Sequence, residues 1–495
     1  MTILFVAVAC CITLFGVYEL QMVVRFWRQK RTQKNTPQSE TKFAASEELP
    51  TVLIQLPIYN ETEVVEQLLH HVAMLDYPPE LLTVQVLDDS TDETPEAVAH
   101  AIAKLPKAKS GIFHHVRRNS RNGFKAGALA HGMELDESEF IAIFDADFAP
   151  QPNFLRRALR QGGPFDDPNV AFVQGRWTYY NSTGSLFAKV QSVLIDRHFL
   201  IQKPFQVRSG NDITFNGSAG VWRRSAIVSA GGWSGRTICE DLDLTYRCVM
   251  LGTKGAYDPE LECPNEIPSD ILAFKLQQRR WAKGTAQNMV NLLPGIMRLG
   301  SAERRVNNIF AISGYLVHPL LLIYTVIWPI LVLGGVDIRL LWFCQITLIL
   351  GNLVAATGFA STYIERNQRP ALANAVLEVL FAMALGISLM VNNSIAFVKG
   401  LFEQGGVFDR TPKVGRGNSH SVRRVAKLHW SVLPEALLGV YGTVASLIMF
   451  SQGFFMEAQQ TLLFGLLMIA VVLLQVFCVR MSHWARLVAA PTGPS

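Results

Sequence analysis

Long apolar segments constrain this chain more than any other feature of its sequence. Residues 2–24 form a long apolar run, and apolar runs dominate again after residue 308, whereas residues 50–300 mix charged, polar and apolar side chains. An apolar helix of about 20 residues is long enough to cross a bilayer. The sequence therefore predicts an integral-membrane protein with one globular region between its membrane helices.

Five segments have the length and hydropathy of membrane helices, and a further segment is ambiguous. The ambiguous segment, 371–398, is apolar but contains Glu378, Asn392 and Asn393, and basic residues flank it on both sides. If it crossed, one basic flank would lie outside, against the preference of Lys and Arg for the cytoplasmic side. The sequence therefore favours an interfacial or re-entrant segment and five crossings, with six as the alternative. The five expected crossings are 2–24, 308–334, 340–364, 432–451 and 459–479.

The basic run RFWRQKRTQK, directly after residue 24, orients the protein. No basic stretch precedes the apolar run 2–24 and no small-residue cleavage site follows it, so this segment is expected to stay as an anchor. Because Lys and Arg favour the cytoplasmic side, we expect the N-terminus outside and the globular region in the cytosol. The expected division is a basic cytosolic linker at 25–49, a globular domain at 50–270, interfacial helices at 271–307 and a C-terminal membrane region at 308–495.

Charge and cysteine content argue against several classes of protein. The net charge is +5, and the basic residues lie beside apolar segments instead of alternating with aromatic residues, which argues against a nucleic-acid partner. The seven cysteines include no Cys-x-x-Cys pair, so neither a disulfide framework nor a zinc site is indicated. Few ionisable residues lie inside the expected spans, which argues against a secondary transporter.

The globular region alternates strand-like and helix-like segments. Apolar runs such as TVLIQLPIY and FIAIF are separated by segments with helical character at 62–75, 94–104 and 125–135. This alternation predicts an α/β fold with a parallel sheet and crossover helices, in which ligands bind beyond the carboxyl ends of the strands. A further helix at 183–199 has one apolar face, which either docks the domain on the bilayer or packs in an ordinary core.

Acidic residues cluster at two of the expected strand ends. Asp145 and Asp147 follow FIAIF, and two carboxylates at a strand end suit a hard divalent cation whose other ligands are diphosphate oxygens. Asp88 and Asp89, in LDDSTDET, have the carboxylates that a nucleoside site needs. The alternatives are a solvated turn for the first pair and an N-capped helix for the second.

Three other motifs carry groups that suit transfer chemistry. Lys125 opens a helix after Gly123, where a cation and backbone N–H groups could meet a diphosphate. In CEDLDLTYR, Asp241 is the candidate general base, and the alternative is a charged helix N-terminus. QQRRWAKG offers an amide, a guanidinium and an indole from Gln277, Arg280 and Trp281, and the alternative is a helix at the membrane interface.

Taken in order, these motifs resemble the signature series of processive family 2 glycosyltransferases, the group of cellulose, mannan, chitin and hyaluronan synthases. The series is LPIYNE, LDDSTDET, NGFKAGAL, DADF, FNGSAGVWR, CEDLDLTYR and QQRRW, and it covers roughly residues 50–290. FNGSAGVWR followed by GGW and EDLDL is most similar to the cellulose-synthase-like mannan and glucan synthases.

The resemblance implies a cytosolic GT-A domain, which is a Rossmann-like nucleotide-diphospho-sugar transferase fold, inserted between transmembrane helices. It also implies an inverting enzyme that moves glucose or mannose from UDP-glucose or GDP-mannose onto a growing β-linked polysaccharide and exports the product through its own channel. A single-transfer lipid glycosyltransferase, of the ceramide or diacylglycerol glucosyltransferase type, is the alternative, because it shows the same aspartates and Gln-x-x-Arg-Trp.

The resemblance further implies a role for each matching residue. Tyr59, Glu61, Asp88, Asp89, Lys125 and Asp145 would bind the nucleotide-sugar, Asp145 and Asp147 would hold Mg²⁺ or Mn²⁺, and Asp241 with Glu240 would be catalytic. Phe215, Asn216, Gly217, Gln277, Arg280 and Trp281 would bind the acceptor. FDRTPK, in the loop 400–430, is similar to the family's gating loop, so Phe408, Thr411 and Lys413 would lie over the nucleotide. Two residues depart from the family pattern: Cys239 stands in place of Thr, and Arg410 in place of Val.

Overall fold

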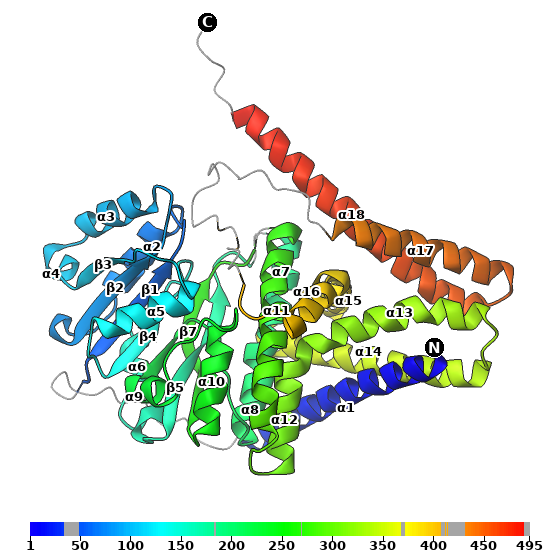
Figure 1. Ribbon diagram of the computed structural model, residues 1–495, viewed down its shortest axis with the longest axis horizontal. Helices are drawn as coiled ribbons and strands as arrows, with labels where there is room; N and C mark the ends of the chain where they lie inside the picture. Colours follow the sequence, from blue (N-terminus) through cyan, green and yellow to red (C-terminus); the bar gives the residue numbers. More distant parts are fainter. Residues whose placement is uncertain are drawn as a thin grey trace, which may run out of the picture.

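The computed structural model describes residues 1–33, 49–182, 185–268, 270–367, 372–406, 411, 413 and 431–489. A globular domain lies at one side of the molecule and long helices extend from the other, with α7, α11 and α12 between them (Figure 1). This arrangement confirms the α/β domain flanked by apolar helices that the sequence predicts.

The globular domain is built on one mixed sheet with the strand order β3-β2-β1-β4-β6-β5-β7. Strands β3, β2, β1 and β4 are parallel, as predicted, but β6 is antiparallel to both of its neighbours. The sheet as a whole is therefore mixed, and its predicted strands are parallel. Gly220, the first residue of β6, pairs with Ile143, the last residue of β4. The chain thus enters β6 from the carboxyl edge of β4 and can only run back. The strands are β1 Val52–Ile58, β2 Leu82–Asp88, β3 Phe113–Arg117, β4 Phe140–Ile143, β5 Val170–Tyr179, β6 Gly220–Arg223 and β7 Lys254–Asn265.

Helices cover the sheet because its central strands are apolar on both faces. Ile54, Val84 and Ile141 are completely buried, as parallel strands between helical layers must be. The predicted helix at 94–104 has these bounds in the structure, and those at 62–75 and 125–135 appear with shifted ends. The helices of this domain are α2 Val65–Ala73, η2 Pro79–Leu81, α3 Thr94–Lys104, α4 Lys107–Ser110, α5 Phe124–Glu134, α6 Phe154–Ala158, η3 Pro164–Asp166, α9 Arg224–Ser229 and α10 Glu240–Met250.

Connecting helices join the domain to the membrane region. Within the expected helix 183–199, α7 packs against helices α14 and α15. Arg366 donates to Ser192 Oγ at 2.6 Å, and Lys189 pairs with Glu378. The apolar face of this helix therefore packs against membrane helices of the same chain. The connecting helices are α7 Leu186–Asp196, the π-helix η4 Arg197–Gln202, α8 Lys203–Arg208, α11 Ile271–Ile296, α12 Ala302–Ser313 and η5 Gly314–Leu316.

Among the described residues, five helical segments are long and apolar enough to cross a membrane, or six if the pair α15 and α16, bent by 45°, is one span. These are the two alternatives that the sequence left open for 371–398. The membrane-region helices are α1 Thr2–Gln33, α13 Val317–Leu333, α14 Ile338–Asn367, α15 Leu372–Ser388, α16 Met390–Phe402, α17 Val432–Ser451 and α18 Phe455–Ala489.

The first helix is longer than the sequence analysis expected. Helix α1 continues to Gln33, through the basic run assigned to a linker at 25–49. Its basic side chains have partners along the way, because Arg25 pairs with Glu303 and Lys30 with Glu365. The helix therefore continues past the end of the apolar run, and in this part it forms ion pairs with α12 and α14. Residues 34–48 lie outside the described part.

Acidic residues of the membrane helices are matched by cations of the connecting helices. Glu19 of α1 accepts from Arg197 Nε at 3.0 Å. Glu378 of α15 pairs with Lys189 of α7, and Glu435 of α17 pairs with Lys275 of α11. Glu19, Glu378 and Glu435 are thus each paired with a cation on a helix that leads into the globular domain.

Candidate active site

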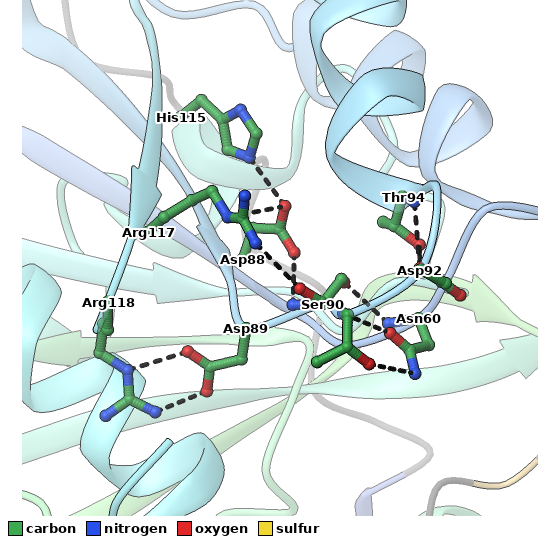
Figure 2. Close-up of polar contacts among 10 residues, drawn as sticks. Asn60, Asp88, Asp89, Ser90, Asp92, Thr94, His115, Arg117 and Arg118 are labelled. Atoms are coloured by element: carbon green, nitrogen blue, oxygen red, sulfur yellow. Dashed lines mark hydrogen bonds and ion pairs between the residues drawn. The ribbon is translucent and has the colours of Figure 1, made fainter. Parts of the chain in front are cut away.

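The carboxyl end of β2 carries a buried, fully engaged carboxylate. Asp88 is the last residue of β2, and its Oδ2 lies 2.8 Å from His115 Nε2 while its Oδ1 accepts from the Ser90 backbone N–H at 2.8 Å (Figure 2). Burial alone would raise the pKa of Asp88, but the hydrogen bonds from His115 and Ser90 hold it below its ordinary value. Asp88 is therefore ionised at neutral pH and shapes the loop after β2.

The neighbouring carboxylate of Asp89 is bound by Arg118, which the sequence analysis missed. Arg118 donates from Nε to Oδ1 at 2.9 Å and from Nη2 to Oδ2 at 2.5 Å, a bidentate pair that Figure 2 shows. The same guanidinium donates to the carbonyls of Asn122 and Phe124, at 2.9 and 3.1 Å. Asp89 thus orients Arg118, and Arg118 holds the loop that leads to Lys125 by hydrogen bonds to two of its carbonyls.

The loop after β1 closes the same edge of the sheet. The Asn60 backbone N–H donates to Ser90 Oγ at 2.8 Å, and Asn60 Oδ1 accepts from the Thr91 backbone N–H at 2.9 Å (Figure 2). The Arg121 guanidinium carbon lies 3.3 Å from the centre of the Tyr59 ring, so these two side chains stack. The predicted nucleotide residue Tyr59 therefore stands at this edge beside a cation.

Lys125 is the centre of the predicted site. Its Nζ donates to Asp145 Oδ1 at 2.6 Å and to the Gly217 carbonyl at 2.8 Å, and it lies 3.7 Å from Glu240 Oε1. Burial lowers the pKa of Lys125, but Asp145 and Glu240 outweigh it and raise the pKa above its usual value. Residues that are far apart in the sequence thus meet at one permanently charged ammonium group.

Asp241 lies on the side of this cluster that faces Gly217. Both Glu240 and Asp241 are in the first turn of α10, where burial raises the pKa of each. The pKa of Asp241 rises to about 7, with Glu240 adding to the effect of burial and Lys125 opposing it. A Cβ added to Gly217, which has φ of +81°, would lie 3.2 Å from Asp241 Oδ2. Asp241 therefore faces the FNG segment and titrates where a general base is effective.

The FNG segment contributes Asn216 and Gly217, but not the ring of Phe215. Phe215 is 1% exposed and packs against Trp222 and Phe172, with ring centres 5.2 and 5.5 Å away. The ring therefore lies in the core of the domain, and the acceptor role of Phe215 stays a prediction. The Asn216 amide nitrogen lies 3.1 Å from Nε2 of His198, a residue of the π-helix that the sequence analysis missed.

Helix α11 carries the Gln-x-x-Arg-Trp residues, and it brings Arg280 to the same cluster. Gln277 is buried, and within the described residues its Oε1 has no hydrogen-bond partner. Burial lowers the pKa of Arg280, and Trp281 packs against the core of the domain. Arg280 is close to four groups that oppose this lowering: Cys239, Asp145, Glu240 and Glu61. The guanidinium and the predicted nucleotide residue Glu61 thus border the Lys125 cluster.

Two of the three predicted gating-loop residues reach this cluster. Thr411 Oγ1 accepts from Arg280 Nη2 at 3.2 Å, and Lys413 Nζ lies 2.5 Å from Asp147 Oδ2. Phe408 and Arg410, with most of the loop 400–430, lie outside the described residues. The loop therefore approaches the site at both positions that are described.

The chemistry of Asp145 and Asp147 fits a divalent cation that takes few ligands from the protein. Within the described residues no group of three His, Cys, Asp or Glu side chains could hold a metal. The Asp145 side chain is 36% exposed, and the Asp147 side chain, 6% exposed, is bound by the Lys413 ammonium. Mg²⁺ commonly uses one or two carboxylates together with substrate phosphates. The pair therefore suits a cation that is completed by a diphosphate.

Cys239 stands where the glycosyltransferases that the sequence resembles have Thr. The backbone at the start of α10 is nevertheless held by hydrogen bonds to α11. The Cys239 carbonyl accepts from Asn288 Nδ2 at 3.0 Å, and the Ile238 backbone N–H donates to Gln287 Oε1 at 2.9 Å. Gln287 and Asn288 both belong to α11. The backbone of this turn is thus fixed by the helix that carries Gln277 and Arg280, independently of the Cys239 side chain.

Known proteins share this sequence region. The family model "Glycosyl transferase family group 2" matches residues 140–358. Glucomannan 4-beta-mannosyltransferase 2 of Arabidopsis thaliana is 36% identical over 56% of this chain and 52% of its own length. Glucomannan 4-beta-mannosyltransferase 1 of Oryza sativa subsp. japonica is 40% identical over 50% of this chain and 48% of its own length. The chain spans about half the length of the curated relatives it matches.

A solved structure shares the fold. The mannosyltransferase PcManGT from Pyrobaculum calidifontis is 20% identical and superposes with a TM-score of 0.52, over 80% of this chain and 99% of its own. This similarity supports the GT-A-like fold of the globular domain. The domain that carries the Lys125 cluster is therefore similar in sequence to glycosyl transferase family group 2 and to the plant glucomannan mannosyltransferases.

Proposed function

We propose that this protein is an inverting hexosyltransferase that moves mannose from GDP-mannose onto a growing β-linked polysaccharide. The observation that carries the proposal is the convergence of Asp145, Gly217 and Glu240 on Lys125 Nζ, with Asp241 against Gly217. The names of the plant relatives favour mannose over glucose, and UDP-glucose is the other donor to be tested.

The proposed chemistry assigns one task to each side of the Lys125 cluster. On the donor side, the ammonium of Lys125 and the guanidinium of Arg280 lie beside Asp145 and would bind diphosphate oxygens as charge develops on the leaving group. On the acceptor side, Asp241 would accept the proton of the attacking hydroxyl. Attack from the face opposite the leaving group inverts the anomeric centre.

Mg²⁺ or Mn²⁺ is the proposed cofactor, held by Asp145 and Asp147. PcManGT was solved in complex with GDP-Man and Mn²⁺. Such a cation neutralises charge on the nucleotide diphosphate. We expect Asp147→Ala to abolish transfer and to weaken Mn²⁺ binding, measured by electron paramagnetic resonance, while the protein stays folded. Full turnover in excess chelator would contradict the proposed cofactor.

The donor and the product are tested together. The full chain in lipid nanodiscs is incubated with Mn²⁺ and radiolabelled GDP-mannose or UDP-glucose, and the products are separated by size. A long, β-mannanase-sensitive product from GDP-mannose is expected. A product that extracts into organic solvent with a single sugar would instead identify a lipid glycosyltransferase, and no turnover with either donor would contradict hexosyl transfer.

We also propose that the domain works on the cytosolic face of a membrane. The support is the basic run Arg25–Arg31 at the domain-proximal end of α1, together with the spans that flank the domain. Nucleotide-sugar and polysaccharide would then meet at the mouth of the membrane region, beside Gln277 and Trp281.

A further inference from the structure

A fully buried ion pair joins α11 to the C-terminal helices. Lys275 Nζ contacts Glu435 Oε1, and both side chains are 0% exposed. Lys275 Nζ also donates to Ser431 Oγ at 3.1 Å, and Gln475 Nε2 donates to the second Glu435 oxygen at 2.7 Å. One buried site thus ties α11 to α17 and α18.

A fourth helix holds the same residue of α11 by its backbone. Asn392 Nδ2 of α16 donates to the Lys275 carbonyl at 3.0 Å and to Asn393 Oδ1 at 2.9 Å. In Figure 1, α16 lies beside α11, and the α17–α18 hairpin extends away from this region. An ion pair and hydrogen bonds at Lys275 therefore join α11 to α16 and to the α17–α18 hairpin.

Stability alone is a poor explanation for this pair. Removing two charges from water is costly, and apolar side chains of the same size often replace a buried ion pair with no loss of stability. Apolar side chains attract one another without a preferred direction. Apolar contacts alone therefore define the position of one helix along its neighbour only weakly. A buried pair can select one register, because any slip leaves a charge unpaired.

The register in question is the position of α11, and therefore of Gln277 and Arg280, along its neighbouring helices. Lys275 precedes Gln277 and Arg280 by less than two turns of the same helix. Gln277 Oε1 is buried and, in the described part of the chain, has no hydrogen-bond partner, so its acceptor capacity is left for a ligand. A displacement of α11 at Lys275 would move Gln277 and Arg280 together.

We propose that Lys275 and Glu435 are a positioning pair that sets α11 against the membrane helices and so holds Gln277 and Arg280 where the acceptor meets the donor. This inference rests on the proposed function. It predicts that loss of the pair harms transfer to the acceptor more than it harms donor binding or donor hydrolysis.

The test uses the full chain in nanodiscs with two kinds of double variant. Lys275→Met with Glu435→Leu removes both charges and keeps apolar volume, and Lys275→Glu with Glu435→Lys reverses them. For the apolar variant we expect an unchanged unfolding temperature, and we expect nucleotide-sugar affinity and acceptor-independent hydrolysis to fall much less than transfer does. Transfer to polysaccharide should fall at least about tenfold, because small misplacements of substrate-positioning groups have effects of this size. The charge-reversed variant should recover part of the transfer rate that either of its single substitutions loses.

A matched control is the ion pair between Lys189 of α7 and Glu378 of α15, which does not involve α11. Lys189→Met with Glu378→Leu should leave the ratio of transfer to hydrolysis unchanged. The positioning role would be overturned if the apolar variant of Lys275 and Glu435 showed wild-type transfer. It would also be overturned if this variant lost hydrolysis, transfer and thermal stability in parallel. Absence of transfer by the unmodified protein would instead refute the proposed function.

Discussion

Glu240 and Asp241 are adjacent carboxylates with different surroundings. Glu240 Oε1 lies 3.7 Å from Lys125 Nζ, whereas Asp241 Oδ2 lies against Gly217 in the FNG segment. This difference supports the proposal that Asp241 serves the acceptor side and Glu240, close to the ammonium and to Arg280, the donor side.

We expect Asp241→Asn to remove transfer while donor affinity stays nearly unchanged. An amide of the same shape cannot accept the proton, and a general base contributes about two to four decades of rate. Turnover is measured with labelled donor, and affinity by calorimetry on the same preparation. Glu240→Gln is the matched control, with weaker donor binding expected. Near-normal turnover in Asp241→Asn together with loss in Glu240→Gln would exchange the two roles.

The same carboxylate predicts a pH dependence. Burial, followed by the charge of Glu240, raises the pKa of Asp241 to about 7. The active, ionised base is therefore present above this pH and is lost as the pH falls through about 7. We expect kcat/KM to decline on the acid side with a midpoint near this value. A profile that is flat from about pH 5.5 to 8 would contradict the assignment.

At the scale of elements, α10 and α11 approach so closely that only glycine fits between them. A Cβ added to Gly284 of α11 would lie 2.3 Å from Cys239 Sγ and 3.0 Å from the Cys239 backbone nitrogen. This contact and the hydrogen bonds from Gln287 and Asn288 place the first turn of α10, and with it Asp241.

Gly284→Ala should therefore lower both stability and transfer. Overpacking of this kind costs about 1–3 kcal/mol, and relief of the clash moves the turn that carries Asp241. The unfolding temperature and the transfer rate report the two effects. Gly386→Ala in α15 is the control, because nothing lies within 4 Å of its added Cβ, and it should leave both quantities unchanged. Normal transfer by Gly284→Ala would show that the close approach does not position the base.

At the scale of the whole molecule, ion pairs connect the helices that lead into the globular domain with the membrane-region helices. Arg197 with Glu19, Lys189 with Glu378 and Lys275 with Glu435 join connecting helices to three membrane-region helices. The domain is therefore attached by directional contacts, and its orientation relative to the membrane follows from the orientation of the spans.

The five-crossing arrangement predicts which loops are accessible from each side. We introduce cysteine at exposed Gly300, between α11 and α12, or at exposed Gln452, between α17 and α18, after replacing Cys10 and Cys11 by alanine. An impermeant maleimide applied to intact cells should label Gln452→Cys but not Gly300→Cys. The opposite pattern would place the globular domain outside.

Local patterns determined the elements of this protein. Apolar runs predicted its membrane helices, because hydropathy and length alone decide whether a helix can span. The alternation of strands and helices predicted the α/β domain, and the position of Asp88, Asp145 and Asp147 after apolar strands placed them at one edge of the sheet. These inferences succeeded because they depend on residues that are near one another in the chain.

Only the tertiary structure decided which partner each charged group meets. The bond between Lys413 and Asp147 spans 266 residues, and that between Lys275 and Glu435 spans 160. Arg118 takes the carboxylate of Asp89, Phe215 enters the core, and β6 runs against its neighbours. None of these follows from local spacing, because the pairing of buried charges and rings depends on how distant helices and strands pack, and packing is a property of the whole fold.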